Sequence, residues 1–471
     1  MECTNIKEEL KNNNENYNFE NVLSIPLILN QIYQFLNIDN IKLLSLCNKN
    51  IYLLYCNQIK KLIINKEAQI SNLQILFDEY DNINNLNLSY CKNIKDFTPL
   101  SKLEKLEILN INSTNVSDIS FLEKNKYIKE LCIIYSKKIK DFIPLSKLEK
   151  LEILNIGYTN ISDISILEKN KNIKELDLSH CTKIKDFIPL SKLEKLEVLN
   201  IGYTNISDIS ILEKNKNIKK LDLTYCENIK DFTPLSNLEK LEILDIYKTN
   251  ISDISFLEKN TNIRKLYLLY CENIKDFTPL SNLEKLEILN IGCTNISYIS
   301  FLAKNKNIKK LYLLYCENIR DFTPLSKLEK LEILNISGTN VSDISFLEKN
   351  KYIKELYLTY CKKIIDFIPL SKLEKLEILN IGYTNISDIS ILEKNKNIKE
   401  LDLSHCKNIE YFTNISKLEK LEILNIGCTN ISDISFLENN KFIKELYLAD
   451  CHKLIKKDNI FKRKGINIHI Y

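Results

Sequence analysis

Several residue types are scarce in this chain of 471 residues, and each scarcity argues against a kind of site. Only seven glycines are present and no Gly-rich phosphate-binding pattern occurs, so a nucleotide loop is not expected. Of the four histidines, His180 and His405 are each followed directly by a cysteine. Neighbouring strand residues point to opposite faces, so neither pair can combine a nucleophile with its base or share a metal. We therefore expect no enzyme, no cofactor and no metal site.

Long apolar runs are missing as well. No stretch approaches the roughly 18–20 residues that a membrane helix needs, and Met1 to Glu20 lacks the apolar core of a signal peptide. Lys and Arg number 66 against 62 Asp and Glu, and a net charge of +4 gives no indication of nucleic-acid binding. The 14 cysteines contain no Cys-x-x-Cys pair, which argues against a zinc cluster. We expect neither nucleic acid nor a membrane as a partner.

The dominant feature of the sequence is an internal repeat of 45 residues. Cysteines recur at this spacing, at Cys181, Cys226, Cys271, Cys316, Cys361, Cys406 and Cys451, and Cys91 lies two periods before the first. Each period divides into similar halves of 23 and 22 residues, counted between central leucines, which gives 17 units from Leu86 to Leu446. An eighteenth unit is expected at Leu62. The cysteines are expected to be buried free thiols, which favours an intracellular location, cytoplasmic or nuclear.

Both halves fit the pattern L-x-x-L-x-L-x-x-(N/C/T)-x-(L/I), as in residues 173–184 and 196–206. This pattern resembles the short-repeat class of leucine-rich-repeat proteins, over roughly four-fifths of the chain. The resemblance implies an α/β solenoid with a concave parallel β-sheet, convex loops and 3₁₀ turns.

Local physical chemistry agrees with that architecture. In each L-x-L the two leucines should point inward and the middle residue outward. Phe232, Leu235 and Leu238 are spaced three apart around Pro234, which predicts a 3₁₀ turn. We expect the solenoid to span residues 61–464 and a capping strand to follow at 465–471, where isoleucines alternate.

The outward positions of the strands are the expected binding surface for a protein target. Tyrosines concentrate there in the middle of the array, at Tyr225, Tyr267, Tyr270, Tyr312, Tyr315, Tyr357 and Tyr360. Asp and His take the equivalent positions on both sides, which favours a functional patch over copying of repeats, although duplication of blocks would also produce it. A row that includes Ile243, Ile288 and Ile333 forms a second, apolar stripe unless lysine stems cover it.

Charged residues beside these strands alternate in sign from unit to unit. Glutamates such as Glu197 and Glu242 alternate with Lys219 and Arg264 on neighbouring strands. We interpret this pattern as a structural ladder of exposed ion pairs, each of which stabilises the fold little.

The segment before the repeats has a different pattern. Residues 1–20 read as a disordered polar tail, and residues 21–60 have the helical spacing of apolar residues, with Pro26 suited to a helix start. The second segment resembles the F-box at Ile25-Pro26, Ile32, Phe35-Leu36, Asp39, Ile41, Leu44 and Cys47 to Lys49. It departs from the F-box pattern in having no acidic residue after Pro26 and in having Tyr52 where the family often has Trp.

The F-box resemblance implies a substrate receptor of a Skp–cullin–F-box ubiquitin ligase. The adaptor-binding residues would be Ile25, Pro26, Leu29, Ile32, Phe35 and Leu36. The receptor would catalyse nothing and would raise the concentration of its target near the ligase. The alternative is a non-catalytic scaffold or regulator, for example a phosphatase-binding one, whose N-terminal helices only cap the solenoid.

Overall fold

The structure is a computed structural model that describes residues 60–63, 73, 82–438, 440–454 and 465–470. The chain divides into two compact units, Met1–Leu151 and Glu152–Tyr471. The F-box-like segment, with its expected adaptor-binding residues, lies outside the described residues. No helix in the described ranges is both long and apolar enough to cross a membrane.

The first unit contains four described strands that pair in parallel with their central leucines in register. They are β1 (Lys61–Ile63), β2 (Asn85–Asn87), β3 (Ile108–Asn110) and β4 (Glu130–Cys132), accompanied by the 3₁₀ helices η1 (Thr98–Lys102), η2 (Ser120–Glu123) and η3 (Ile143–Lys147). Strand β1 is centred on Leu62, which confirms the expected eighteenth unit.

The second unit repeats the same strand-and-turn module. Its strands are β5 (Ile153–Asn155), β6 (Glu175–Asp177), β7 (Val198–Asn200), β8 (Lys220–Asp222), β9 (Ile243–Asp245), β10 (Lys265–Tyr267), β11 (Ile288–Asn290), β12 (Lys310–Tyr312), β13 (Ile333–Asn335), β14 (Glu355–Tyr357), β15 (Ile378–Asn380), β16 (Glu400–Asp402), β17 (Ile423–Asn425), β18 (Glu445–Tyr447) and β19 (Asn467–His469). Its 3₁₀ helices are η4 (Ser165–Lys169), η5 (Ile188–Lys192), η6 (Ser210–Lys214), η7 (Thr233–Asn237), η8 (Ser255–Glu258), η9 (Thr278–Asn282), η10 (Ser300–Lys304), η11 (Thr323–Lys327), η12 (Ser345–Lys349), η13 (Ile368–Lys372), η14 (Ser390–Lys394), η15 (Thr413–Lys417) and η16 (Ser435–Leu437).

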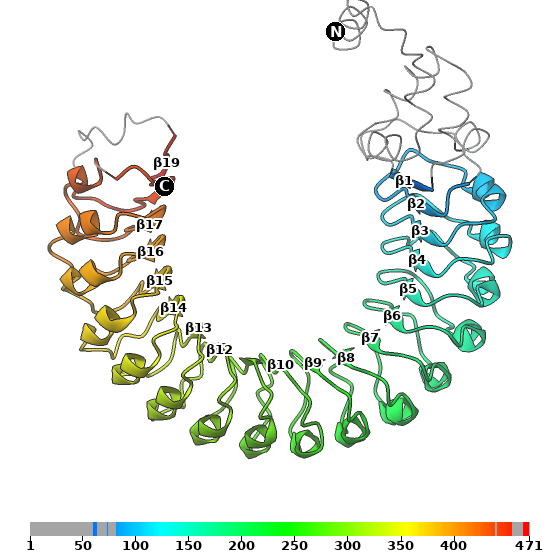
Figure 1. Ribbon diagram of the computed structural model, residues 1–471, viewed down its shortest axis with the longest axis horizontal. Helices are drawn as coiled ribbons and strands as arrows, with labels where there is room; N and C mark the ends of the chain where they lie inside the picture. Colours follow the sequence, from blue (N-terminus) through cyan, green and yellow to red (C-terminus); the bar gives the residue numbers. More distant parts are fainter. Residues whose placement is uncertain (1–59, 64–72, 74–81, 439, 455–464, 471) are drawn as a thin grey trace, which may run out of the picture. The chain divides into compact units, whose positions relative to one another are not determined.

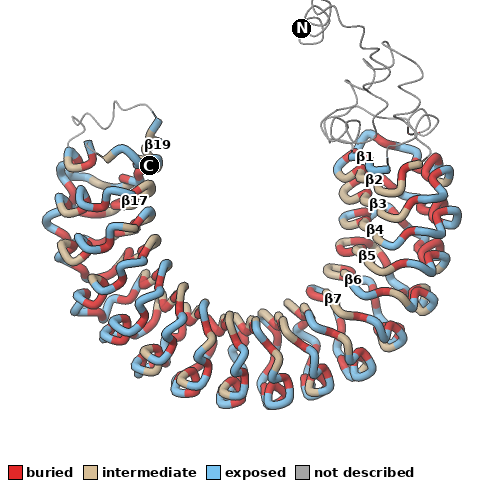
Figure 2. The backbone as a smooth tube through the Cα atoms, viewed as in Figure 1, coloured by how far each residue is buried: buried red, intermediate tan, exposed pale blue. Residues whose placement is uncertain are grey.

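The strands of the second unit line the inner face of an arc, and the 3₁₀ helices form its outer face (Figure 1). Each strand pairs in parallel with the next, and leucine faces leucine in register, as in Leu266↔Leu289. Leu266 and Leu268 are fully buried while Tyr267 between them is half-exposed, which confirms the expected alternation. Buried and exposed residues alternate along the strands and the outer turns of this unit (Figure 2). The leucines of one unit are covered only by the neighbouring units, which is why the array is stable where a single unit is not.

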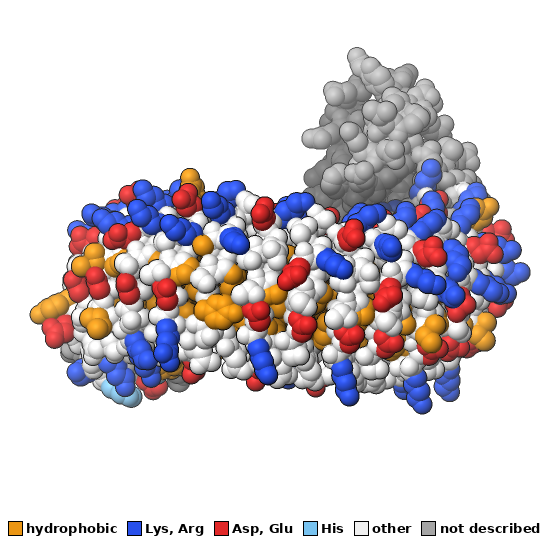
Figure 3. Space-filling model, turned by 90° about the horizontal axis from the view of Figure 1, so that it is seen from below, with side chains coloured by type: hydrophobic (Ala, Val, Ile, Leu, Met, Phe, Trp, Pro, Cys, Tyr) orange, Lys and Arg blue, Asp and Glu red, His pale blue; other side chains and the backbone are white. Residues whose placement is uncertain are grey.

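The outer turns form for a local reason. Asp231 accepts a hydrogen bond from the backbone N–H of Thr233 at 2.9 Å, and Pro234 occupies the first turn of η7. Phe232, Leu235 and Leu238 are then all buried, as their spacing predicted. Charged side chains flank a discontinuous band of hydrophobic ones on the outer surface of the second unit (Figure 3).

Side chains at the ninth position of the units connect neighbouring repeats by hydrogen bonds. Thr204 donates its hydroxyl to the carbonyl of Ile201 at 2.7 Å, and the thiol of Cys226 donates to the same carbonyl at 3.2 Å. The cysteines therefore do more than fill space, because each thiol is also a weak donor. Burial raises the pKa of the Cys226 and Cys316 thiols to about 11, so both stay protonated.

A buried asparagine ladder was not anticipated from the sequence. Asn305, fully buried after η10, donates through Nδ2 to the carbonyls of Leu280 at 2.9 Å and Leu283 at 3.0 Å in the preceding unit. The same pair of bonds recurs at Asn125, Asn215, Asn260, Asn350 and Asn395. In the other half-repeats a leucine such as Leu328 takes this position. The sequence feature that could have indicated this ladder is an asparagine that recurs every 45 residues, shortly after each Ser-(Ile/Phe)-Leu segment.

At the C-terminal end of the array, β19 pairs in parallel with β18. Ile466, Ile468 and Ile470 are half-buried and alternate with exposed residues. A strand therefore covers the last repeat at the place where the alternating isoleucines predicted one.

Candidate protein-binding face

Three tyrosines project from the middle of the inner face of the second unit. Tyr267, Tyr312 and Tyr357 lie on β10, β12 and β14, separated in register by Asn290 and Asn335. All three are half-exposed. They form the strand row, a name used below for these three side chains. Such side chains present large ring areas with a polar tip at little entropic cost, which suits protein recognition.

The strand row is held by its surroundings. Tyr357 donates its hydroxyl to Glu355 at 3.1 Å. Burial, together with the Glu355 carboxylate, raises the pKa of Tyr357 to about 12. Burial also raises the pKa of Tyr312, and Glu355 adds to the effect. The hydroxyls therefore remain neutral donors at physiological pH.

Charge on the inner face changes sign along the array. Within the second unit, the first residue of alternate strands is Glu175, Lys220, Lys265, Lys310, Glu355, Glu400 and Glu445. Lys265 and Lys310 thus begin the strands of two tyrosines of the strand row, Lys220 begins the alternate strand before them, and Glu355 begins the strand of the third tyrosine. A partner with complementary charge would be oriented by this pattern.

The isoleucine stripe offers less surface than expected. Ile243 and Ile288 are half-buried, and Ile333 is only 8 % exposed. Ile333 lies between Lys310 and Glu355, two long side chains, in the sheet register. Ile333 therefore offers little free surface, and its contact with a target stays a prediction.

The remaining predicted tyrosines form a different row. Tyr225, Tyr270, Tyr315 and Tyr360 follow the strands and have positive φ angles of 57°, 60°, 55° and 64°. They lie beyond the ends of β8, β10, β12 and β14 and not on them, so they line the margin of the inner face. One residue per unit shares this left-handed conformation, which bulky side chains adopt only at a cost.

Stacking between repeats offsets part of that cost. His180 lies between Tyr158 and Tyr203, with ring centroids 3.9 and 4.0 Å away, and Tyr203 stacks on Tyr225 at 4.4 Å. Farther along, Tyr383 lies 3.8 Å from His405. The sequence analysis singled out His180, His405 and Tyr225 separately but did not predict that they belong to stacks of rings. The stack could have been predicted from the spacing of these aromatic residues, which are 22 or 23 positions apart and therefore occupy the same position in successive units.

The sequence of strand β9 and of the residues directly after it departs from the repeat. Tyr247 and Lys248 stand where three other second halves have Gly-Tyr. The hydroxyl of Tyr247 lies 3.3 Å from that of Tyr225, in the row at the margin of the inner face. Lys248 lies over the Tyr225 ring at 4.7 Å. The same strand carries Asp245, where neighbouring second halves have asparagine.

Asp245 faces Asp222 directly across β8 and β9. Burial raises the pKa of Asp245 to about 6, and the Asp222 charge adds to the rise. A hydrogen bond from the Tyr247 N–H at 3.0 Å opposes it. The inner face thus contains a carboxylate whose ionisation is unfavourable in the folded state.

His180 and Cys181, adjacent in the sequence, have different partners. His180 is stacked between tyrosines while the Cys181 thiol donates to the carbonyl of Ile156 at 3.3 Å, so the two are not paired. No group of three or more His, Cys, Asp or Glu residues within the described ranges is placed to hold a metal ion.

Stacked parallel strands on an inner face and 3₁₀ turns outside define the chain as a solenoid. The family model for leucine-rich repeats (2 copies) matches residues 149–192, 194–237 and 239–282. The model for the BspA-type leucine-rich-repeat region (6 copies) matches residues 336–455. The protein is a leucine-rich-repeat solenoid, as its sequence pattern predicted.

Solved structures place the fold in the same class. A leucine-rich-repeat protein of Leptospira interrogans is 16 % identical with a TM-score of 0.51, covering 90 % of this chain and 98 % of that one. The receptor TLR13, solved in complex with ssRNA13, is 17 % identical with a TM-score of 0.57, covering 82 % and 68 %. An internalin, inlF of Listeria monocytogenes, is 25 % identical with a TM-score of 0.47, covering 71 % and 87 %. No curated protein matches the sequence.

Proposed function

We propose that the protein is a non-catalytic binding module that holds a protein target against the inner face of its solenoid. The strand row of Tyr267, Tyr312 and Tyr357 is the observation that carries this proposal. Three half-exposed aromatic rings on alternate strands, beside Lys265 and Lys310, combine apolar area with donors and charge, the composition of protein interfaces.

Replacing Tyr267, Tyr312 and Tyr357 together with alanine should abolish target capture and leave the fold intact. A loss of at least about tenfold in capture is expected, because interface tyrosines are common hot spots. Capture is measured by pull-down from source-cell extract with quantitative mass spectrometry, and folding by circular dichroism.

A matched control replaces three exposed tyrosines that lie outside the strands, Tyr298, Tyr352 and Tyr411. This control has the same composition change and should capture as well as the native chain. Equal capture by both triple variants would remove the strand row from the proposal.

The finer proposal is a substrate receptor of a Skp–cullin–F-box ubiquitin ligase. It rests on the F-box-like sequence of residues 21–60, outside the described residues. Ile25, Pro26, Leu29, Ile32, Phe35 and Leu36 would bind the adaptor. The alternative is a scaffold or regulator in which the same segment only caps Leu62. The two proposals differ in whether the segment binds a second protein.

Co-purification of the full chain with a Skp-family adaptor separates these alternatives. Stable binding that is lost in the Pro26→Ala/Leu29→Asp variant is the result expected for a ligase receptor. A folded full chain that retains no adaptor would leave the scaffold as the proposed function.

A further inference from the structure

A second surface lies at the edge of the sheet where strands β8 to β13 begin. We call it the entry edge, formed by the residues directly before those strands. A shallow depression of about 610 Å³ there is lined by Lys219, Lys240, Arg264, Lys285, Lys309 and Lys330. Only two carboxylates, those of Glu242 and Glu287, share it. Six cations against two anions leave a local charge of +4 (6 − 2), and none of the three tyrosines of the strand row lines the depression.

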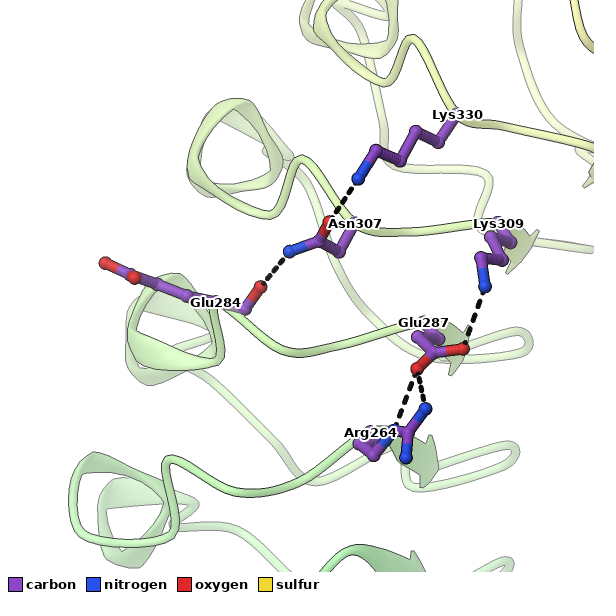
Figure 4. Close-up of polar contacts among 6 residues, drawn as sticks. All are labelled: Arg264, Glu284, Glu287, Asn307, Lys309 and Lys330. Atoms are coloured by element: carbon purple, nitrogen blue, oxygen red, sulfur yellow. Dashed lines mark hydrogen bonds and ion pairs between the residues drawn. The ribbon is translucent and has the colours of Figure 1, made fainter.

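Three of these lysines are held by neutral partners. Lys330 donates to Asn307 Oδ1 at 2.7 Å, and Asn307 Nδ2 donates to the carbonyl of Glu284 at 2.9 Å (Figure 4). Lys285 and Lys240 donate in the same way to the preceding asparagines, at 2.6 and 2.7 Å. An amide oxygen fixes each ammonium group without cancelling its charge. An incoming anion therefore meets cations that are already ordered, which lowers the entropic cost of binding.

Arg264 changes the ion pairing at the centre of the depression. In other units the lysine at this position pairs with the glutamate of the preceding unit, as Lys219 does with Glu197 at 2.7 Å. Arg264 instead donates from Nε and Nη2 to the following glutamate, Glu287, with the Nε bond at 2.8 Å. Lys309 approaches the other oxygen of Glu287 at 3.2 Å (Figure 4).

This exchange leaves two cations on Glu287 and none on Glu242. Across the described part of the chain, Glu242 forms no ion pair or side-chain hydrogen bond. Its carboxylate is half-buried within the depression and open to a donor from a bound molecule.

We propose that the entry-edge depression is a docking site for an extended acidic segment of a partner protein. Carboxylates of the segment pair with Lys240, Lys285 and Lys330, and a backbone N–H of the segment donates to Glu242. The three lysines precede alternate strands, so they recur at about 10 Å, which matches every third residue of an extended polyproline-II segment. A phosphodiester backbone offers no donor to Glu242, and no aromatic side chain lines the depression to stack bases, so the chemistry favours a peptide over a nucleic acid.

The test measures binding of a fluorescent peptide of about ten residues, with glutamate at every third position, to the full chain by anisotropy. The control peptide has glutamine at those positions. We expect binding of the glutamate peptide only, and about a tenfold loss of affinity between low and physiological salt. Lys240→Glu/Lys285→Glu should weaken binding by at least about tenfold.

Two further variants make the test specific to the site. Arg264→Lys keeps the charge but restores the usual pairing with Glu242, so it should weaken binding by about threefold or more. Lys375→Glu makes the charge change of one of those two substitutions at the equivalent position outside the depression, where Lys375 lies 4.1 Å over the Tyr352 ring, and should leave binding within about twofold.

Four results would overturn the proposal. The first is equal binding of the two peptides, and the second is an equal loss of affinity in Lys375→Glu. The third is a single-stranded oligonucleotide that binds as tightly as the glutamate peptide and whose binding is lost in the same variants. The fourth is a dimer of the chain that Lys240→Glu/Lys285→Glu dissociates. The triple alanine variant of Tyr267, Tyr312 and Tyr357 should retain peptide binding. Failure of the proposed inner-face binding is therefore distinguishable from failure of the entry-edge docking site.

Discussion

Asn305→Asp should destabilise the solenoid by about 3 kcal/mol or more at pH 7. The substitution keeps the size of the side chain but puts a carboxylate oxygen where Nδ2 now lies, 2.9 Å and 3.0 Å from two carbonyl oxygens. The site is fully buried, so water cannot screen the repulsion. The carboxyl must either ionise without solvent or keep its proton, and part of the lost stability should return near pH 4. Urea unfolding of the full chain measures the difference.

The matched control is Asn290→Asp, the same chemical change on the half-exposed inner face. The chain itself places aspartate at this position of the repeat, at Asp245, where burial disfavours the charged form, so the cost should be about 1 to 2 kcal/mol and smaller than at Asn305. Equal losses in the two variants would contradict a structural role for the buried amide.

Asp245→Asn should stabilise the protein by about 1 to 3 kcal/mol at pH 7. In the folded chain the pKa of Asp245 is raised from 3.8 to about 6, mainly by burial. Between these two values the folded state keeps a proton that the unfolded state has released, so stability falls as the pH rises through this interval. Above this interval the destabilisation caused by ionising Asp245 has reached its full size. Asparagine retains the acceptor for the Tyr247 N–H, as Asn290 does for Gly292 at 3.2 Å, and removes the charge opposite Asp222.

The expected measurement is a set of urea titrations from pH 4 to pH 8. The variant and the native chain should have similar stabilities near pH 4 and diverge up to about pH 6 to 7. Asp402→Asn is the control, because its register neighbours Asn380 and Asn425 carry no charge. A gain of the same size in the control, or a gain at Asp245 that does not change with pH, would show that the raised pKa of Asp245 is not its cause.

Much of the fold follows from the sequence because a solenoid is specified locally. The L-x-L alternation determines which residues of each strand are buried, and one repeat determines the next. The positions of Leu62, Phe232 and Leu235 were therefore predicted correctly. The same reasoning placed the strand row of tyrosines on the inner face, where they lie half-exposed.

Other features depend on contacts between units and could not be read from one repeat. The sequence places Tyr270 and Tyr315 beside the strand row, but their left-handed backbone puts them on the margin of the inner face. Arg264 occupies the lysine position of an ion-pair ladder, yet its longer side chain reaches the next glutamate and leaves Glu242 unpaired. Ile333 takes an outward position in the strand pattern, but between its register neighbours Lys310 and Glu355 it is buried.

By itself, then, the sequence determined the repeat, the parallel sheet, the outer turns and the set of side chains directed away from the core. These follow from side-chain alternation and from spacing along the chain, which are local properties. Only the tertiary structure decided which of those side chains stack, which remain open to a partner and which cations keep an uncancelled charge. Those outcomes depend on distances between residues about 22 or 23 positions apart, which stacking of the units brings into contact.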